Sequence, residues 1–150
     1  MRKHFMAMGL LIAALSLTAA VVSAQGGVEA GVAAQWKTSV QHSKFSQDYN
    51  GMKEITSHLQ HVVNCLEGPT GPGFEGGAGN PCQGQGAGMI ADSKKAGASN
   101  AKFASAVPWM EAADTLAKNG LKTRSPEAAK AYGQATQTVL EVIGGSLNVR

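Results

Sequence analysis

The sequence predicts an all-α protein, a small antiparallel bundle of about four helices that follows a secretory signal peptide. Apolar residues recur at steps of three and four along several segments, and no segment shows the sustained alternation of a half-buried strand. Glycine and proline interrupt the pattern near positions 51, 68–88, 120 and 126. The chain has 150 residues, which is enough for one domain with a real core but not for two.

Residues 1–24 have the organisation of a secretory signal. Two basic residues stand at the start, an apolar run follows, and positions 22–24 are small residues that suit a cleavage site. The apolar run is shorter than a membrane span requires. We therefore expect cleavage before Gln25 and export of residues 25–150 as a single helical domain. The expected destination is the periplasm, with the medium as the alternative and no membrane attachment after cleavage.

The charge pattern argues against a nucleic-acid partner. The chain has 13 basic and 10 acidic residues, and two of the basic residues belong to the predicted signal, so the exported chain is close to neutral. Its basic residues form no cluster and do not alternate with aromatic residues. Nucleic-acid-binding surfaces combine a basic cluster with such aromatic side chains, so we expect no nucleic acid to bind.

The most regular helical pattern lies in residues 52–66. With one residue every 100°, a single apolar stripe forms at steps of three and four, made of Met52, Ile55, Leu59, Val62 and Leu66. A second stripe beside it carries Glu54, His58, His61 and Cys65. These polar side chains are therefore expected at the edge of the buried face of this helix.

Residues 28–49 predict an earlier helix with a weaker apolar face. Asn50-Gly51 is a turn or helix-break signal, so we expect two antiparallel helices that meet there, with one continuous bent helix as the alternative. His42 lies eight residues before the turn and His58 lies seven after it. Because a helix rises about 1.5 Å per residue, the hairpin places both at similar heights, and His42 can face His58 and His61.

These polar residues form a candidate metal site. Imidazole nitrogen and carboxylate oxygen bind borderline cations, so His42, His58 and His61, with Glu54 or water as the fourth ligand, suit zinc, copper or nickel. A b-type haem is a weaker alternative, and covalent c-type attachment is excluded because the chain has no Cys-x-x-Cys-His motif. The simplest interpretation is that the histidines border the core and hydrogen-bond to carbonyl groups or water.

A glycine-rich and proline-rich connection covers residues 67–98, between the second and third helices. Cys65 and Cys82 are the only cysteines of the chain, and in an exported protein they are expected to pair and anchor this loop. Closing a loop of 17 positions is worth about 3 kcal/mol. The glycines do not form a phosphate-binding loop, because the required glycine order and the Gly-Lys-Ser/Thr sequence are missing.

Two further helices follow the loop. Ser99-Asn100 can cap the third, which Pro108 is expected to kink or restart and which should end at Asn119-Gly120. Ser125-Pro126 starts the fourth with a serine cap and a proline in the first turn. Gly144-Gly145 is expected to end it. Together with the hairpin before the loop, these segments complete the predicted bundle.

The sequence leaves two functions of different class open. The first is a small exported protein that binds a transition metal, or less favourably haem, through the histidine cluster. The second is a structural or interaction module that presents the disulfide-stapled loop to a protein partner or to another copy of the chain. We expect no enzymatic activity, because no serine, cysteine or carboxylate arrangement supplies a nucleophile, a base and an orienting group together.

Overall fold

The computed structural model describes the backbone of residues 9–149 and the side chains of residues 27–149. Residues 1–8, the start of the predicted signal, lie outside the described residues. All regular structure in the described part is helical, which confirms the all-α prediction. The elements in order are α1 (Gly9–Asp48), α2 (Met52–Glu67), the 3-10 turn η1 (Gly76–Ala78), α3 (Met89–Ala96), α4 (Ala101–Leu121) and α5 (Pro126–Leu147).

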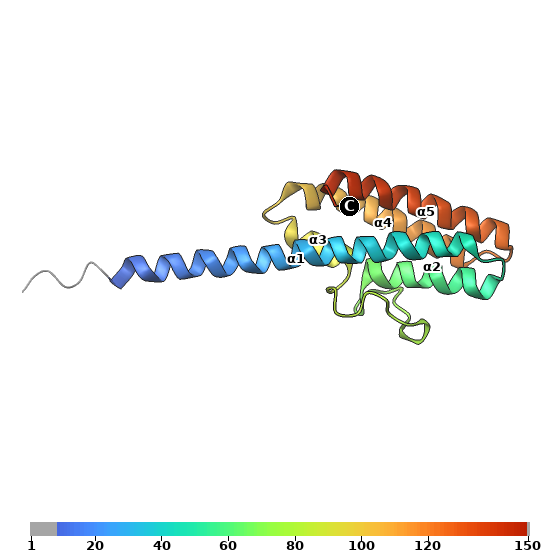
Figure 1. The fold of residues 1–150 in the computed structure, drawn as a ribbon, viewed down its shortest axis with the longest axis horizontal. Helices are drawn as coiled ribbons and strands as arrows, with labels where there is room; N and C mark the ends of the chain where they lie inside the picture. Colours follow the sequence, from blue (N-terminus) through green and yellow to red (C-terminus); the bar gives the residue numbers. More distant parts are fainter. Residues whose placement is uncertain (1–8, 150) are drawn as a thin grey trace, which may run out of the picture.

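The four long helices form an antiparallel bundle. α1 packs against α2 and α5, and α4 packs against the same two helices, so the four enclose one core. Figure 1 shows successive long helices running in opposite directions, with the glycine-rich connection hanging beside α2. The turn after α1 separates two distinct helices, so the hairpin alternative is correct and the single bent helix is wrong.

The core is aliphatic and draws on all five helices. The largest fully buried apolar side chains are Val32, Ile55, Leu59, Val62, Val63, Leu66, Met89, Met110, Leu140 and Ile143. Four of them belong to the stripe expected on α2, and Met52 packs at its end. The periodicity of α2 therefore identified the buried face of this helix correctly.

The inner face of α1 is smaller and more polar than its sequence suggests. The large apolar residues in this part of the sequence include Val32, Trp36, Val40 and Phe45. The fully buried residues are instead Val32, Gln35, Ser39, Ser43 and Ser46. Each serine hydroxyl donates to a carbonyl of its own helix, which satisfies a buried polar group without a partner from another helix. Such a face lets α1 and α5 approach closely.

A fifth helix, α3, lies inside the stretch that was expected to be loop. Its eight residues make only about two turns, too few for an apolar period to be recognised. Met89, Ser93 and Ala96 nevertheless face the core. The glycine-rich connection therefore ends at Gly88, where φ is 116°, a value that favours glycine.

Two helices continue through residues that were expected to interrupt them. α4 is unbroken at Pro108, where the exposed position lets water reach the carbonyl that loses its helical partner. α5 continues through Gly144-Gly145 to Leu147, and Asn148, with a φ of 57°, forms a left-handed cap after it. Gly144 is inside the helix for a packing reason, because Trp36 of α1 lies against it.

The helix α1 begins at Gly9 and has no break at the predicted cleavage position. Its first half extends beyond the bundle in Figure 1. Cleavage before Gln25 and export therefore stay predictions. Among the residues whose side chains are described, no helix combines the length and the apolarity that crossing a bilayer requires.

Gly144→Ala is expected to destabilise the protein by about 1–3 kcal/mol. A methyl group there would come within 2.3 Å of the Trp36 ring, and this partly buried ring is held in place by its hydrogen bond to the Leu140 carbonyl. Gly145→Ala is the matched control, since nothing lies within 4 Å of its added methyl group and alanine favours a helix by up to about 1 kcal/mol. Urea unfolding measures both, and equal effects of the two substitutions would contradict the close contact.

Candidate metal centre

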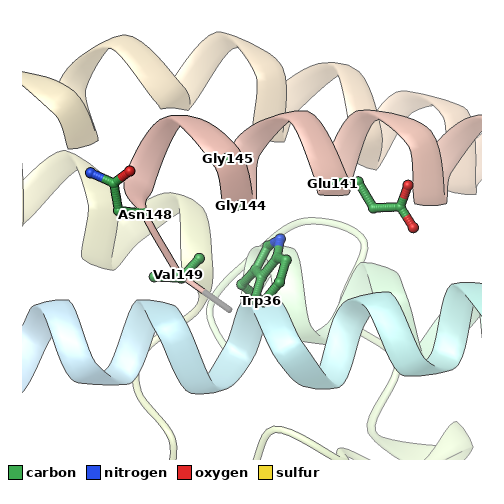
Figure 2. Close-up of a pocket in the computed structure, with 6 residues that line it drawn as sticks. All are labelled: Trp36, Glu141, Gly144, Gly145, Asn148 and Val149. Carbon is green, nitrogen blue, oxygen red and sulfur yellow. The ribbon is translucent and has the colours of Figure 1, made fainter.

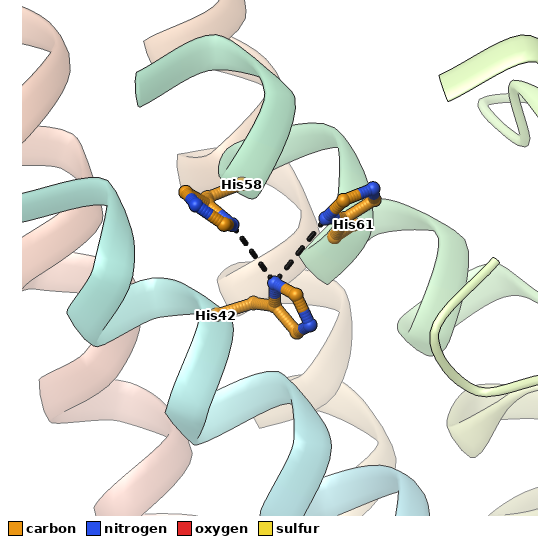
Figure 3. Close-up of side chains that lie close together, drawn as sticks. All are labelled: His42, His58 and His61. Atoms are coloured by element: carbon orange, nitrogen blue, oxygen red, sulfur yellow. Dashed lines mark hydrogen bonds between the residues drawn. The ribbon is translucent and has the colours of Figure 1, made fainter. Parts of the chain in front are cut away.

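Three histidines from two helices meet on one flank of the α1–α2 hairpin. His42 lies near the end of α1, and His58 and His61 lie one turn apart on α2. Figure 3 shows His58 and His61 directed toward the His42 ring. The turn and the helical rise align them as the sequence indicated, and each of the three is partly exposed.

The Nδ1 atoms of the three rings stand at the spacing of metal ligands. His42 Nδ1 is 3.0 Å from His58 Nδ1 and 3.2 Å from His61 Nδ1. Nitrogen ligands about 2.05 Å from a tetrahedral zinc ion lie about 3.3 Å from each other. One ligand atom from each histidine falls within 4.8 Å of the other two, so the three residues could hold one metal ion between them.

If the three rings are neutral, hydrogen bonds among them cannot satisfy all three Nδ1 atoms. His61 Nε2 lies 2.7 Å from the Ala78 carbonyl, and since a carbonyl only accepts, this nitrogen carries the hydrogen. In the neutral ring His61 Nδ1 is then a bare acceptor. His42 Nδ1 carries at most one hydrogen. It can donate this hydrogen to His61 Nδ1 or to His58 Nδ1, but not fully to both. A cation resolves this conflict because it accepts all three lone pairs at once.

His42 and His58 are held in the neutral form that metals bind. Burial, followed by the nearby His61 and His58 rings, lowers the pKa of His42 from 6.5 to about 4. Burial and then the charge of His61 also lower the pKa of His58. A metal therefore does not have to displace a proton from either residue at neutral pH.

Acid is expected to destabilise the metal-free protein through His42. The unfolded chain protonates this histidine below pH 6.5, whereas the folded chain, with a pKa of about 4, does not, so the free energy of unfolding falls as pH drops between these values. Because His42 is only half-buried and screened by solvent, we expect a loss of about 1–2 kcal/mol. Urea unfolding across this range should show a smaller loss for His42→Gln, which cannot titrate. Equal losses in the two proteins would contradict the assignment.

The Glu54 carboxylate does not lie with the three histidines. Its exposed side chain folds back to the start of α2, where a methyl group added to Gly51 would meet the Glu54 Oε2 atom at 2.1 Å. An acid in the first turn suits the positive end of the helix dipole. The structure therefore leaves the fourth ligand to water or to an external donor.

Cys65 and Cys82 form the predicted disulfide, with their Cα atoms 5.3 Å apart. Neither sulfur is available as a thiolate ligand. Cys65 lies one turn after His61 on α2, and Cys82 lies four residues after Ala78 in the loop. The disulfide therefore ties together the two chain segments that form the hydrogen bond between His61 and the Ala78 carbonyl.

Asn64 anchors the same loop by hydrogen bonds, and its role was not predicted from the sequence. Its Nδ2 donates to the carbonyls of Glu75 at 2.9 Å and Gly79 at 2.6 Å, while its Oδ1 accepts from the Glu75 backbone N–H at 2.9 Å. Gln60 adds a hydrogen bond to the Gly73 carbonyl. An asparagine among the apolar residues that end α2 signals a buried polar role, but the sequence could not identify its partners.

Aromatic rings shield one side of the cluster. Tyr49 stacks on His58 with ring centroids 5.2 Å apart, and Phe45 lies 5.2 Å from His58 and 5.7 Å from His42. These rings restrict how the imidazoles can rotate. Their apolar surface also lowers the local dielectric constant around any charge bound there.

Another hollow of about 290 Å³ lies between α1 and the end of α5 (Figure 2). It is lined by Trp36, Glu141, Gly144, Gly145, Asn148 and Val149. The Trp36 indole N–H already donates to the Leu140 carbonyl at 2.6 Å, and Glu141 is exposed. This hollow offers no convergent polar groups, so the histidine cluster is the stronger candidate site.

Comparisons with known protein families, curated proteins and solved structures found no match.

Proposed function

We propose that this protein is an exported, non-catalytic binding protein that holds one transition-metal ion between α1 and α2. His42, His58 and His61 supply three imidazole ligands, and water or an external donor supplies the fourth. The observation that carries the proposal is the meeting of three Nδ1 atoms, with contacts of 3.0 and 3.2 Å, in a place where two of the rings stay unprotonated. Zinc, copper and nickel all accept such a ligand set.

The spacing favours an ion over haem. Two axial histidines on opposite faces of a haem iron place their nitrogens about 4 Å apart, with the porphyrin ring between them. The contact of 3.0 Å between His42 and His58 leaves no slot for such a ring. Export is supported by the signal-like start of the chain and by the Cys65–Cys82 disulfide, which is typical of an oxidising compartment.

Metal binding is tested by elemental analysis of untagged protein from its native compartment, together with thermal unfolding. We expect near-stoichiometric metal and a rise in melting temperature of about 10 °C when the ion is at 100 times its dissociation constant. His58→Ala combined with His61→Ala should abolish both results. Gln41→Ala, an exposed change beside His42, is the control and should keep them. A protein that holds no metal and takes up none would refute the proposal.

A further inference from the structure

The three imidazoles of the proposed site bring no negative charge to the ion they hold. In the described part of the chain, the group of close ligand atoms consists of His42, His58 and His61, and both cysteines are in the disulfide. A divalent ion would therefore keep its full charge in a half-buried position. Removing charge from water is costly unless it is paired, so the loaded site favours an anionic partner.

None of the acidic side chains near the histidines in sequence or in the neighbouring loop belongs to the group of close ligand atoms; these are Asp48, Glu54, Glu67 and Glu75. The Glu54 carboxylate lies beside Gly51 at the start of α2. The Glu75 carboxylate accepts from the Gly77 backbone N–H at 3.1 Å, where it caps η1. Neither is directed to the histidines, so an anion that neutralises the ion must come from outside the chain.

The coordination shell has room for such an anion. Zinc binds four ligands, and copper(II) in a tetragonal site also binds four close ligands, so three histidines leave one position open. All three histidines are partly exposed, which gives a solute access to this position. Phe45 and the half-exposed Tyr49 lie against His58 and replace part of the water around its ring, which strengthens attraction between the ion and an anion.

We propose that the metal-loaded site binds a small anion as the fourth ligand of the ion. The anion replaces a water molecule and approaches from the solvent-exposed side of the cluster. This inference rests on the proposed metal binding. It goes further because it makes the loaded protein a receptor for a second, negatively charged solute.

Azide titration of the copper(II)-loaded protein tests the inference. Bound azide gives copper(II) a charge-transfer absorption that free azide and copper-free protein lack. We expect this band to appear and to saturate with azide in the loaded protein. The metal-free protein and the His42→Ala, His58→Ala, His61→Ala triple variant should show no saturable band under the same conditions.

The possible failures are distinguishable. Copper uptake with a spectrum that azide leaves unchanged would overturn the anion site while the proposed metal binding stands. Absence of stoichiometric copper uptake would overturn both proposals.

Discussion

Replacement of Lys118 by methionine is expected to destabilise the protein by about 3–5 kcal/mol at neutral pH. The Lys118 ammonium group bridges the Glu67 carboxylate of α2 and the Asp114 carboxylate of α4, and lies 2.7 Å from Asp114 Oδ2. The two carboxylate side chains are only 6% and 11% exposed, respectively. Methionine keeps the length of the side chain but removes the charge, so two buried acids would lose their shared cation.

The pH dependence of the free energy of unfolding of Lys118→Met distinguishes the loss of a charge from the loss of packing. Burial raises the pKa of Asp114 from 3.8 to about 6 even with Lys118 present. Loss of Lys118 removes an interaction that lowers the pKa of Asp114, so Asp114 of the variant takes up its proton at a higher pH than in the wild type. Because this proton uptake favours folding, the deficit of Lys118→Met should narrow as pH falls toward 6 and change little below it. Urea unfolding at about pH 7.5 and about pH 5 measures this change.

Lys94→Met is the matched control for the buried triad. The Lys94–Glu111 pair joins α3 to α4, and both of its side chains are more than half exposed. An exposed pair contributes about 0–1 kcal/mol, and its removal should show little pH dependence in this range. A Lys118→Met deficit that is equally small, or that is constant with pH, would contradict the role assigned to the buried charges.

Helix α2 and its turn were predictable because their determinants are local in sequence. The apolar stripe that includes Ile55 and Leu59 sets the buried face, and Asn50-Gly51 sets the hairpin. Once those are known, the rise per residue places His42 beside His58. The disulfide was predictable from the cysteine count and the predicted compartment, since two cysteines allow only one pairing.

The supports of the site were not predictable, because they join segments that no local rule pairs. The Ala78 carbonyl contacts His61 from 17 positions away, and any loop residue could have supplied it. Lys118 meets Glu67 across 51 positions. The buried face of α1, which consists mostly of small polar side chains, was not predictable for another reason. Serines such as Ser39 and Ser43 satisfy their own hydroxyl groups, so they occupy the core without an apolar signal.

Removal of the disulfide by Cys65→Ser with Cys82→Ser is expected to lower the free energy of unfolding by about 3 kcal/mol. We also expect metal affinity to fall by about 10–100-fold. Both cysteines are buried, and the bridge holds the loop whose Ala78 carbonyl orients His61. Without the disulfide, the His61 ring must become ordered when the metal binds. The free energy that this ordering costs weakens metal binding.

The measurement must separate a loosened loop from a less stable protein. Gly144→Ala provides that control, because it should weaken the bundle by a comparable amount at the contact with Trp36, away from the loop. Metal affinity is measured by competition with a chelator at a temperature where every variant is folded. The disulfide variant should lose affinity and Gly144→Ala should keep it. If both lose affinity equally, the site depends on overall stability; if neither does, the loop does not orient His61.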